Sequence, residues 1–148
     1  GGGHERGLRS GTLNVPAIVG LGKACEIAQK EMWDDNTRIS VLRGKLEHQL
    51  LDFAGLRING STRDRLYNTS NICFKGKKTS EMIVQLRNIA ISFGSACTSA
   101  KPEPSHVLKA MGMNDEDIFS SIRFSLGKFT TEEEINETIR IIKGVYGE

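Results

Sequence analysis

Apolar residues in the first third of the chain recur at helical spacing. Between residues 14 and 32 they return every three or four positions, and Pro16 suits the first turn of a helix. A second series with the same spacing runs from residue 39 to residue 53, and Gly55 follows it. The pattern therefore predicts two helices in this part of the chain, the second ending at the glycine.

Shorter segments farther along the chain have the composition and alternation of β-strands. In residues 121–126 apolar and polar side chains alternate, which predicts a half-buried strand. The other expected strands are residues 56–59, 69–74 and 90–93. A helix is expected to start within residues 75–80 and to have its apolar stripe within residues 82–89, and the other expected helices are residues 104–111 and 131–145. Thr131 and Glu134 have the spacing of a capping box at the start of the last helix. Together these elements predict an α+β fold, with a small sheet of three to four mostly antiparallel strands covered by helices.

The composition is that of a globular protein. The 148 residues are 38% hydrophobic and 26% charged, which suits one domain, or a large piece of one, with a buried core. No apolar run approaches the roughly 18 residues of a membrane span. The 20 basic and 18 acidic residues are interspersed and give a net charge of +2, whereas a nucleic-acid binder has a concentrated basic face. We therefore expect neither a membrane nor a nucleic acid as a partner.

The start of the chain and its cysteines limit where the protein works. The opening sequence GGGHERGLRSGT contains no methionine and no apolar signal region, so we expect a fragment of a longer protein that is not secreted. The three cysteines are widely spaced and none has C-x-x-C spacing, which argues against a zinc or thioredoxin-like site. A reducing, cytoplasmic compartment fits best.

Cys97 lies in a different kind of segment from the other two cysteines. Cys25 and Cys73 occupy apolar positions of a predicted helix and strand, so we expect them to be packed structural thiols. Cys97 lies in FGSACTSAKPEPSHVL, among small and polar residues that permit an exposed loop. Lys101 and His106 are near in sequence and could stabilise a thiolate. On these residues alone, a reactive thiol and an ordinary loop cysteine are equally good interpretations.

Two further features could bind anions. Residues 5–12, ERGLRSGT, combine guanidinium, hydroxyl and backbone donors that can face a phosphate, although a polar turn before a helix is the more common case. Arg123 is predicted to lie on the side of its strand opposite Ile122 and Phe124. From there it could bind a carboxylate through two hydrogen bonds, although a surface salt bridge is the more usual role.

Three segments, taken in order, resemble cysteine desulfurases of the NifS/IscS-like group within the class-V aminotransferases. They are GGGHERGLRSGTLNVPAIVGLGKA, GSACTSAKPEPSHVLKAMG and SSIRFSLGKFTTEEEI. The resemblance runs from residue 1 to the end of the chain. It implies the C-terminal portion of a fold-type I pyridoxal-phosphate enzyme that provides sulfur for iron–sulfur cluster assembly and other thio-cofactors. The cysteine segment resembles the group with a long mobile loop.

The resemblance also implies roles for individual residues. Cys97 matches the nucleophile that attacks the sulfur of L-cysteine, so that a persulfide remains on Cys97 and L-alanine is released. Arg123 matches the arginine that holds the α-carboxylate of the substrate. Thr12 matches a residue that reaches the cofactor phosphate of the neighbouring subunit, which implies a homodimer. Arg9 and His4 lie in the same motif, and Arg9 is expected to be a further cofactor-binding residue.

Two departures from the family pattern matter. Phe93 stands where relatives often have a serine, so a stiffer hinge of the loop is expected. The lysine that anchors pyridoxal phosphate belongs to a segment that is not in this chain, so we expect the chain alone to be inactive. Residues 1–14 are then expected to be a cofactor-phosphate-reaching segment of the large domain. Residues 15–148 are expected to be the C-terminal small domain, with the cysteine loop at 94–103.

The implied partners are L-cysteine, a second copy of the subunit and a sulfur-acceptor protein such as an iron–sulfur scaffold. An alternative of another class is a stand-alone sulfur carrier or scaffold module whose Cys97 accepts a persulfide made elsewhere. A phosphate- or nucleotide-binding module built on residues 5–12 is less favoured, because it leaves Cys97 and Arg123 unexplained.

Overall fold

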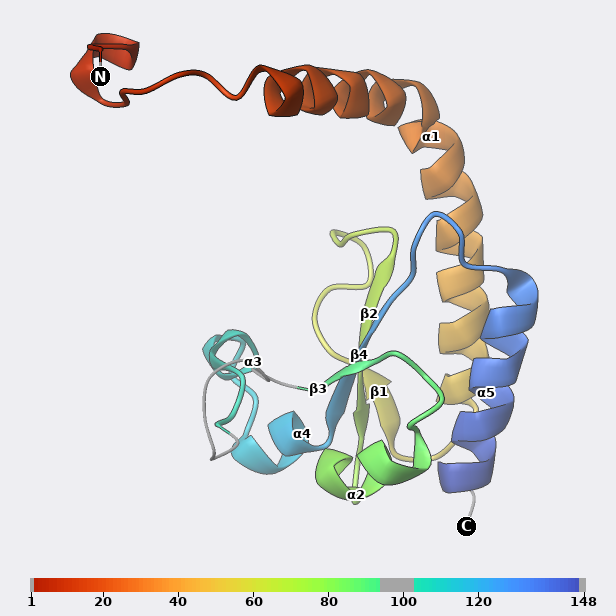
Figure 1. Ribbon diagram of the computed structural model, residues 1–148. Helices are drawn as coiled ribbons and strands as arrows, with labels where there is room; N and C mark the ends of the chain where they lie inside the picture. Colours follow the sequence, from red (N-terminus) through yellow and green to blue (C-terminus); the bar gives the residue numbers. More distant parts are fainter. Residues whose placement is uncertain (1, 94–102, 147–148) are drawn as a thin grey trace. The chain divides into compact units, whose positions relative to one another are not determined.

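The computed structural model describes residues 2–93 and 103–146 and has two compact units (Figure 1). Unit 1 is residues 1–35 and unit 2 is residues 36–148. The long helix α1 (Val15–Leu51) contributes to both units. Within the described residues, no helix combines the length and the apolar character that crossing a membrane would need.

Helix α1 is continuous, so the prediction of two separate helices is wrong on this point. The residues that join the two apolar series, 33–38, include neither glycine nor proline, so nothing in them interrupts the helical hydrogen bonds. The predicted start is confirmed, because Asn14 caps the helix. Its Oδ1 accepts a hydrogen bond of 3.2 Å from the N–H of Ala17.

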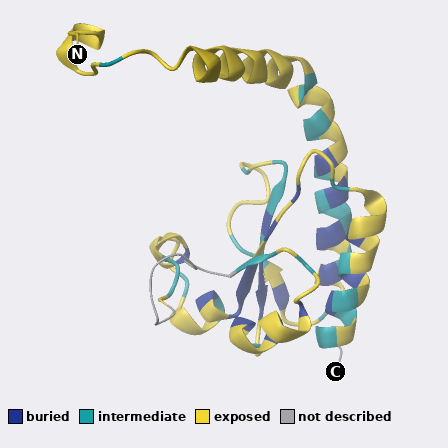
Figure 2. Cartoon of the chain, in the orientation of Figure 1, coloured by how far each residue is buried: buried dark blue, intermediate teal, exposed yellow. Residues whose placement is uncertain are grey.

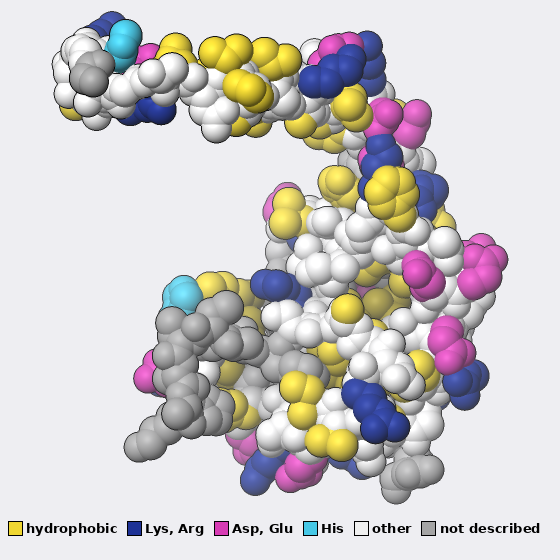
Figure 3. Space-filling model, viewed as in Figure 1, with side chains coloured by type: hydrophobic (Ala, Val, Ile, Leu, Met, Phe, Trp, Pro, Cys, Tyr) yellow, Lys and Arg dark blue, Asp and Glu magenta, His cyan; other side chains and the backbone are white. Residues whose placement is uncertain are grey.

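The apolar side chains of α1 that belong to unit 1 are exposed. Val19 and Leu21 are 65% and 66% exposed and Trp33 is 78% exposed. Figure 3 shows hydrophobic side chains along this part of the helix. Cys25 is exposed as well, so the prediction that it is a packed structural thiol is wrong. The spacing predicted the helix correctly, but the residues that the structure describes leave its apolar stripe uncovered.

In its described residues, unit 2 is built on a four-stranded sheet with the order β1-β2-β4-β3, and every pairing is antiparallel. The strands are β1 (Leu56–Ile58), β2 (Thr69–Phe74), β3 (Ser92–Phe93) and β4 (Ser121–Ser125). The helices that follow α1 are α2 (Thr79–Gln85), α3 (His106–Ala110), α4 (Asp115–Phe119) and α5 (Glu132–Tyr146). The predicted α+β fold with a small antiparallel sheet is confirmed. Strand β3 is shorter than predicted, and α4 was not predicted.

One face of the sheet packs against α1 and α5 to form the core. Its fully apolar contacts come from Ile39, Leu42, Leu46 and Leu50 of α1, Ile72 and Phe74 of β2, Ile122 and Phe124 of β4, and Ile135, Ile139 and Ile142 of α5. Figure 2 shows these buried positions on the sheet and on the two helices. Truncation of such a side chain costs about 2–5 kcal/mol, so the packing of this face contributes strongly to the stability of unit 2. The opposite face is left for polar side chains.

A buried ion pair fixes the start of β2. Arg65 donates a hydrogen bond of 2.6 Å to Glu47 on α1 and another of 2.7 Å to the carbonyl oxygen of Thr69. The side chains of Arg65 and Glu47 are only 12% and 11% exposed. Arg43, also on α1, donates to the carbonyl oxygen of Leu66 at 2.8 Å. These bonds tie the segment before β2 to the helix that supports the sheet.

Candidate functional site

Arg123 lies on the polar face of the sheet, as the alternation of β4 predicted. Ile122 and Phe124 are buried on the core face, whereas Arg123 is exposed on the other face. In the part of the chain that the structure describes, no hydrogen bond or ion pair engages its guanidinium group. A rigid strand therefore presents an arginine that is available to an anion, and a carboxylate can accept two hydrogen bonds from it.

Two polar residues on neighbouring strands lie beside Arg123. Asn71 of β2 and Ser92 of β3 are its partners across the two ladders, so the three residues form a row across the sheet. Paired residues of antiparallel strands point to the same face, and both neighbours are half-buried. Asn71 and Ser92 were not predicted from the sequence as site residues. Alternation could have placed Asn71 on the polar face, but the strand pairing is needed to place it beside Arg123.

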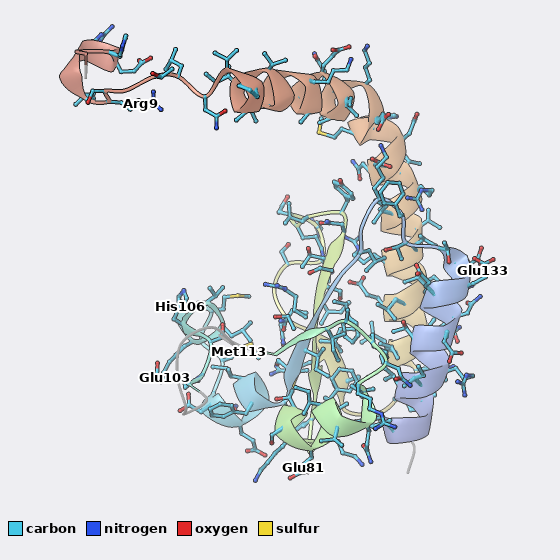
Figure 4. All side chains as sticks on the ribbon, in the orientation of Figure 1. Arg9, Glu81, Glu103, His106, Met113 and Glu133 are labelled. Atoms are coloured by element: carbon cyan, nitrogen blue, oxygen red, sulfur yellow. The ribbon has the colours of Figure 1, made fainter. Side chains whose placement is uncertain are left out.

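Cys97 lies outside the described residues, as does Lys101, so the predicted nucleophile stays a prediction. The strand that precedes it is described, and Ser92 on that strand is paired with Arg123. Five peptide steps separate Ser92 from Cys97, and a chain of that length spans at most about 18 Å. The sulfur-bearing residue is therefore tethered to the strand next to the arginine. His106 begins α3 and is exposed (Figure 4).

The segment at residues 5–12 has an unusual backbone. Glu5, Arg6 and Gly7 have φ values of 52°, 57° and 82°, which is the left-handed region. Non-glycine residues pay roughly 1–2 kcal/mol each to adopt it, and such strain clusters at functional sites. Two backbone hydrogen bonds of 3.0 Å, from Gly7 to His4 and from Leu8 to Glu5, close the turn. The segment is therefore more than an ordinary polar linker before α1.

Arg9 and Thr12 follow this turn in unit 1. The Arg9 guanidinium donates to the carbonyl oxygen of Gly11 at 3.2 Å, and Gly11 has a φ of 97°. Arg9 and Thr12 are both exposed, and the picture of all side chains labels Arg9 just after the turn (Figure 4). Arg9 and Thr12 are thus close in sequence within unit 1, while Arg123 belongs to unit 2. A guanidinium, a hydroxyl and glycine backbone groups are a donor set that suits a phosphate.

Cys73 is buried, as predicted, and has the properties of a structural thiol. Burial raises the pKa of the Cys73 thiol above its usual value, although nearby Arg57 acts in the opposite direction. The thiol also faces the carbonyl oxygen of Asp117 at 3.6 Å. Among the described residues there is no group of three or more His, Cys, Asp or Glu side chains that could hold a metal ion.

A groove of about 630 Å³ lies elsewhere in unit 2, between residues 88–91 and α5. Its lining combines apolar side chains with Glu133, Glu134 and Glu137 of α5. Figure 4 labels Glu133 near the start of that helix. Arg9, Thr12 and Arg123 are not among the lining residues, so the groove is separate from the predicted site residues.

Comparison with protein families gives the class of this chain. The model of the aminotransferase class-V family matches residues 3–137. The chain therefore belongs to the aminotransferase class-V family.

Within curated proteins, the chain is similar to the cysteine desulfurase IscS of Haemophilus influenzae strain PittEE. The two are 52% identical over 144 residues, which are 97% of this chain and 36% of the relative. The chain thus spans a little over a third of the length of that relative.

Solved structures give the same picture of the fold. A NifS-like protein from Rickettsia africae ESF-5 matches with a TM-score of 0.84 and 32% identity, over 100% of this chain and 39% of that one. A structure of SspA in complex with cysteine matches with a TM-score of 0.55 and 30% identity, over 88% of this chain and 35% of that one.

Proposed function

We propose that this chain is the C-terminal part of a pyridoxal-phosphate-dependent cysteine desulfurase. The full enzyme would convert L-cysteine to L-alanine and leave a persulfide on Cys97. Membership of the class-V aminotransferases and similarity to a protein named cysteine desulfurase support the proposal. The observation that carries it is Arg123, which is exposed and unpaired among the described residues, on the strand beside the one that leads to Cys97.

In the proposed reaction Cys97 acts as the nucleophile. Its thiolate attacks the sulfur of L-cysteine, so that a sulfur–sulfur bond forms while the bond between the substrate's Cβ and sulfur breaks. The electron pair of the broken bond stays with carbon, and a proton completes the methyl group of L-alanine. Pyridoxal phosphate, when bound, supplies the electron-withdrawing group that makes this cleavage possible.

Arg123 holds the substrate in this proposal. A charge-assisted pair between its guanidinium and the α-carboxylate contributes about 1.5–3 kcal/mol of binding. The strand fixes the arginine, so the amino acid is oriented before reaction, and such orientation is worth several kcal/mol of the barrier. SspA has been solved in complex with cysteine, which supports a cysteine-binding site in a protein of this fold.

Arg9 and Thr12 would hold the phosphate end of the cofactor. Their donor groups and the left-handed backbone before them fit a phosphate, which accepts hydrogen bonds on three oxygens. In this proposal they contact the cofactor of a neighbouring subunit in a homodimer. Residues 1–14 then belong to the large domain of the enzyme and residues 15–148 to its small domain. The lysine that anchors the cofactor would lie in another part of the parent polypeptide.

The sulfur held on Cys97 would pass to an acceptor protein. An iron–sulfur scaffold protein in the cytoplasm is the acceptor we propose, because a persulfide delivers sulfur directly to a second thiol.

The full-length enzyme with pyridoxal phosphate and L-cysteine tests this function. Cys97→Ser should abolish the release of sulfide and alanine, because the hydroxyl is a far weaker nucleophile than a thiolate. The absorption spectrum of the bound cofactor should be unchanged in the same variant. A Cys97→Ser enzyme that still releases sulfide at the parent rate would show that Cys97 is not the nucleophile.

Cys25→Ser is the matched control, since it makes the same change at a thiol to which the proposal gives no role. It should keep at least about half of the parent activity. Equal losses in the two variants would indicate damage to the fold and would argue against a specific role for Cys97.

A further inference from the structure

The polar face of the sheet contains a hydrogen-bonded chain that begins at a backbone carbonyl. The Ser121 hydroxyl donates to the carbonyl oxygen of Asp117 at 2.6 Å. Nδ2 of Asn59 donates to Ser121 Oγ at 2.9 Å and to Asn71 Oδ1 at 2.6 Å. The backbone supports the same arrangement, because the N–H of Asn59 donates to the carbonyl oxygen of Asn71 at 2.8 Å.

The donor and acceptor of every bond in this hydrogen-bonded series follow from the Asp117 carbonyl oxygen at its start. A carbonyl oxygen can only accept, so the single hydrogen of Ser121 is used on Asp117 and its oxygen must accept from Asn59. The group of Asn59 that faces Ser121 is therefore its NH₂ group. That same group faces Asn71, so the atom of Asn71 on this side must be the acceptor Oδ1. The orientation of the Asn71 amide is thus set by the carbonyl group of Asp117, three hydrogen bonds away.

The NH₂ group of Asn71 is left to donate elsewhere. Among the described residues, nothing accepts a hydrogen bond from it. Asn71 is half-buried and lies directly opposite Arg123 on the same face of the β2–β4 ladder. Paired Cα atoms of antiparallel strands are about 4.5–5.5 Å apart, which puts both side chains within reach of one small ligand.

Asn71 Oδ1 accepts a hydrogen bond from Asn59, and among the described residues no hydrogen bond joins it to Arg123. Both neighbours therefore have donors that no described group accepts from: the N–H groups of a guanidinium and those of an amide. A carboxylate offers only acceptors, with about four lone-pair sites on two oxygens. Building on the function proposed above, we propose that Asn71 is a second donor to the α-carboxylate of the amino-acid substrate and that Asn59 is its positioning residue.

Asn71→Asp in the full-length enzyme tests the proposal. Aspartate keeps the acceptor that Asn59 needs but replaces the NH₂ group by an oxygen that pairs with Arg123 and repels the substrate. The KM for L-cysteine should rise at least about 50-fold while kcat falls less than about fivefold. Inhibition by L-alanine should weaken in parallel, and inhibition by ethylamine, which has no carboxylate, should not. The melting temperature should stay within about 2 °C of the parent.

Asn59→Asp tests the positioning role without touching Asn71. The new carboxylate can only accept, so the Asn71 amide should turn its NH₂ group toward it and present its oxygen to Arg123. The KM for L-cysteine should rise about tenfold. Asn136→Asp makes the same chemical change at an exposed position of α5 and should leave both KM and kcat within about twofold.

An Asn71→Asp enzyme whose KM for L-cysteine stays within about threefold of the parent would overturn the inference. So would an equal weakening of L-alanine and ethylamine, since that outcome indicates a structural role. An unchanged KM in Asn59→Asp would overturn the positioning role of that residue. Arg123→Ala distinguishes failure of the Asn71 role from failure of the proposed function. An unchanged KM for L-cysteine in Arg123→Ala would show that there is no carboxylate site at this face.

Discussion

Arg65 and Arg123 differ in what surrounds them, and this difference separates a structural arginine from a binding one. Arg65 is mostly buried and is satisfied by Glu47 and by the carbonyl oxygen of Thr69. Arg123 is exposed on a rigid strand, and no described group pairs with it. Breaking a buried pair leaves an uncompensated charge, whereas an exposed arginine can lose its side chain with little effect on folding. Arg123 is therefore the position at which a substitution can change binding alone.

The thiols also differ in burial, since Cys73 is buried and Cys25 is exposed. Cys73 should resist a thiol-reactive reagent at about pH 8 in the folded protein, because it is buried and because burial raises its pKa and so lowers its thiolate fraction. Peptide mapping after labelling measures this, and denaturant should make Cys73 fully reactive. Labelling of Cys73 at the same rate in the folded and unfolded protein would contradict its structural role.

At the level of elements, most of the sheet could be predicted from the sequence. Strands β1, β2 and β4 lie within a residue of their predicted ends, because their apolar positions alternate or are β-branched. Helix α4 was missed because its five residues are too few to show a helical period. The sequence feature that could have indicated α4 is Asn114, a residue type common at helix N-caps. In the structure its Oδ1 accepts a hydrogen bond of 2.8 Å from the N–H of Asp117.

The pairing of strands explains why only part of the site was predictable. The side of β4 on which Arg123 lies follows from alternation along one strand. Its neighbours Asn71 and Ser92 depend on the order and register of three strands, which are long-range properties. The wrong prediction for Cys25 has a similar cause, because helical spacing identifies an apolar stripe but not whether anything covers it.

The predicted capping box of α5 is confirmed. The N–H of Glu134 donates to Thr131 Oγ1 at 3.2 Å, and the N–H of Thr131 donates to Glu134 Oε2 at 2.9 Å. Helix α5 supplies Ile135, Ile139 and Ile142 to the core, so its first turn matters for the stability of unit 2.

Thr131→Ala should therefore lower the free energy of unfolding by about 1 kcal/mol, through loss of the cap. Denaturant titration measures it. Asn136→Ala, at an exposed position within the same helix, is the control and should change the value by less than about 0.5 kcal/mol. Equal effects of the two substitutions would show that the cap contributes nothing specific.

At the scale of the whole molecule, this chain corresponds to only part of the relatives that it matches. It spans 36% of the Haemophilus relative, and in unit 1 an apolar stripe of α1 lies exposed. A helix with so much exposed apolar surface is normally covered in the complete protein. In our proposal the reaction belongs to the full-length enzyme, and these residues supply only the carboxylate site, the nucleophile and the phosphate-reaching segment.

Peptide mass spectrometry of the full-length enzyme after a single turnover with L-cysteine tests the central claim most directly. The peptide that contains Cys97 should gain the mass of one sulfur atom, and a reducing agent should remove it. The peptides of Cys25 and Cys73 should gain nothing, and residues 1–148 without the rest of the enzyme should stay unmodified throughout. A sulfur atom on another residue, with Cys97 unmodified while alanine is formed, would contradict the account.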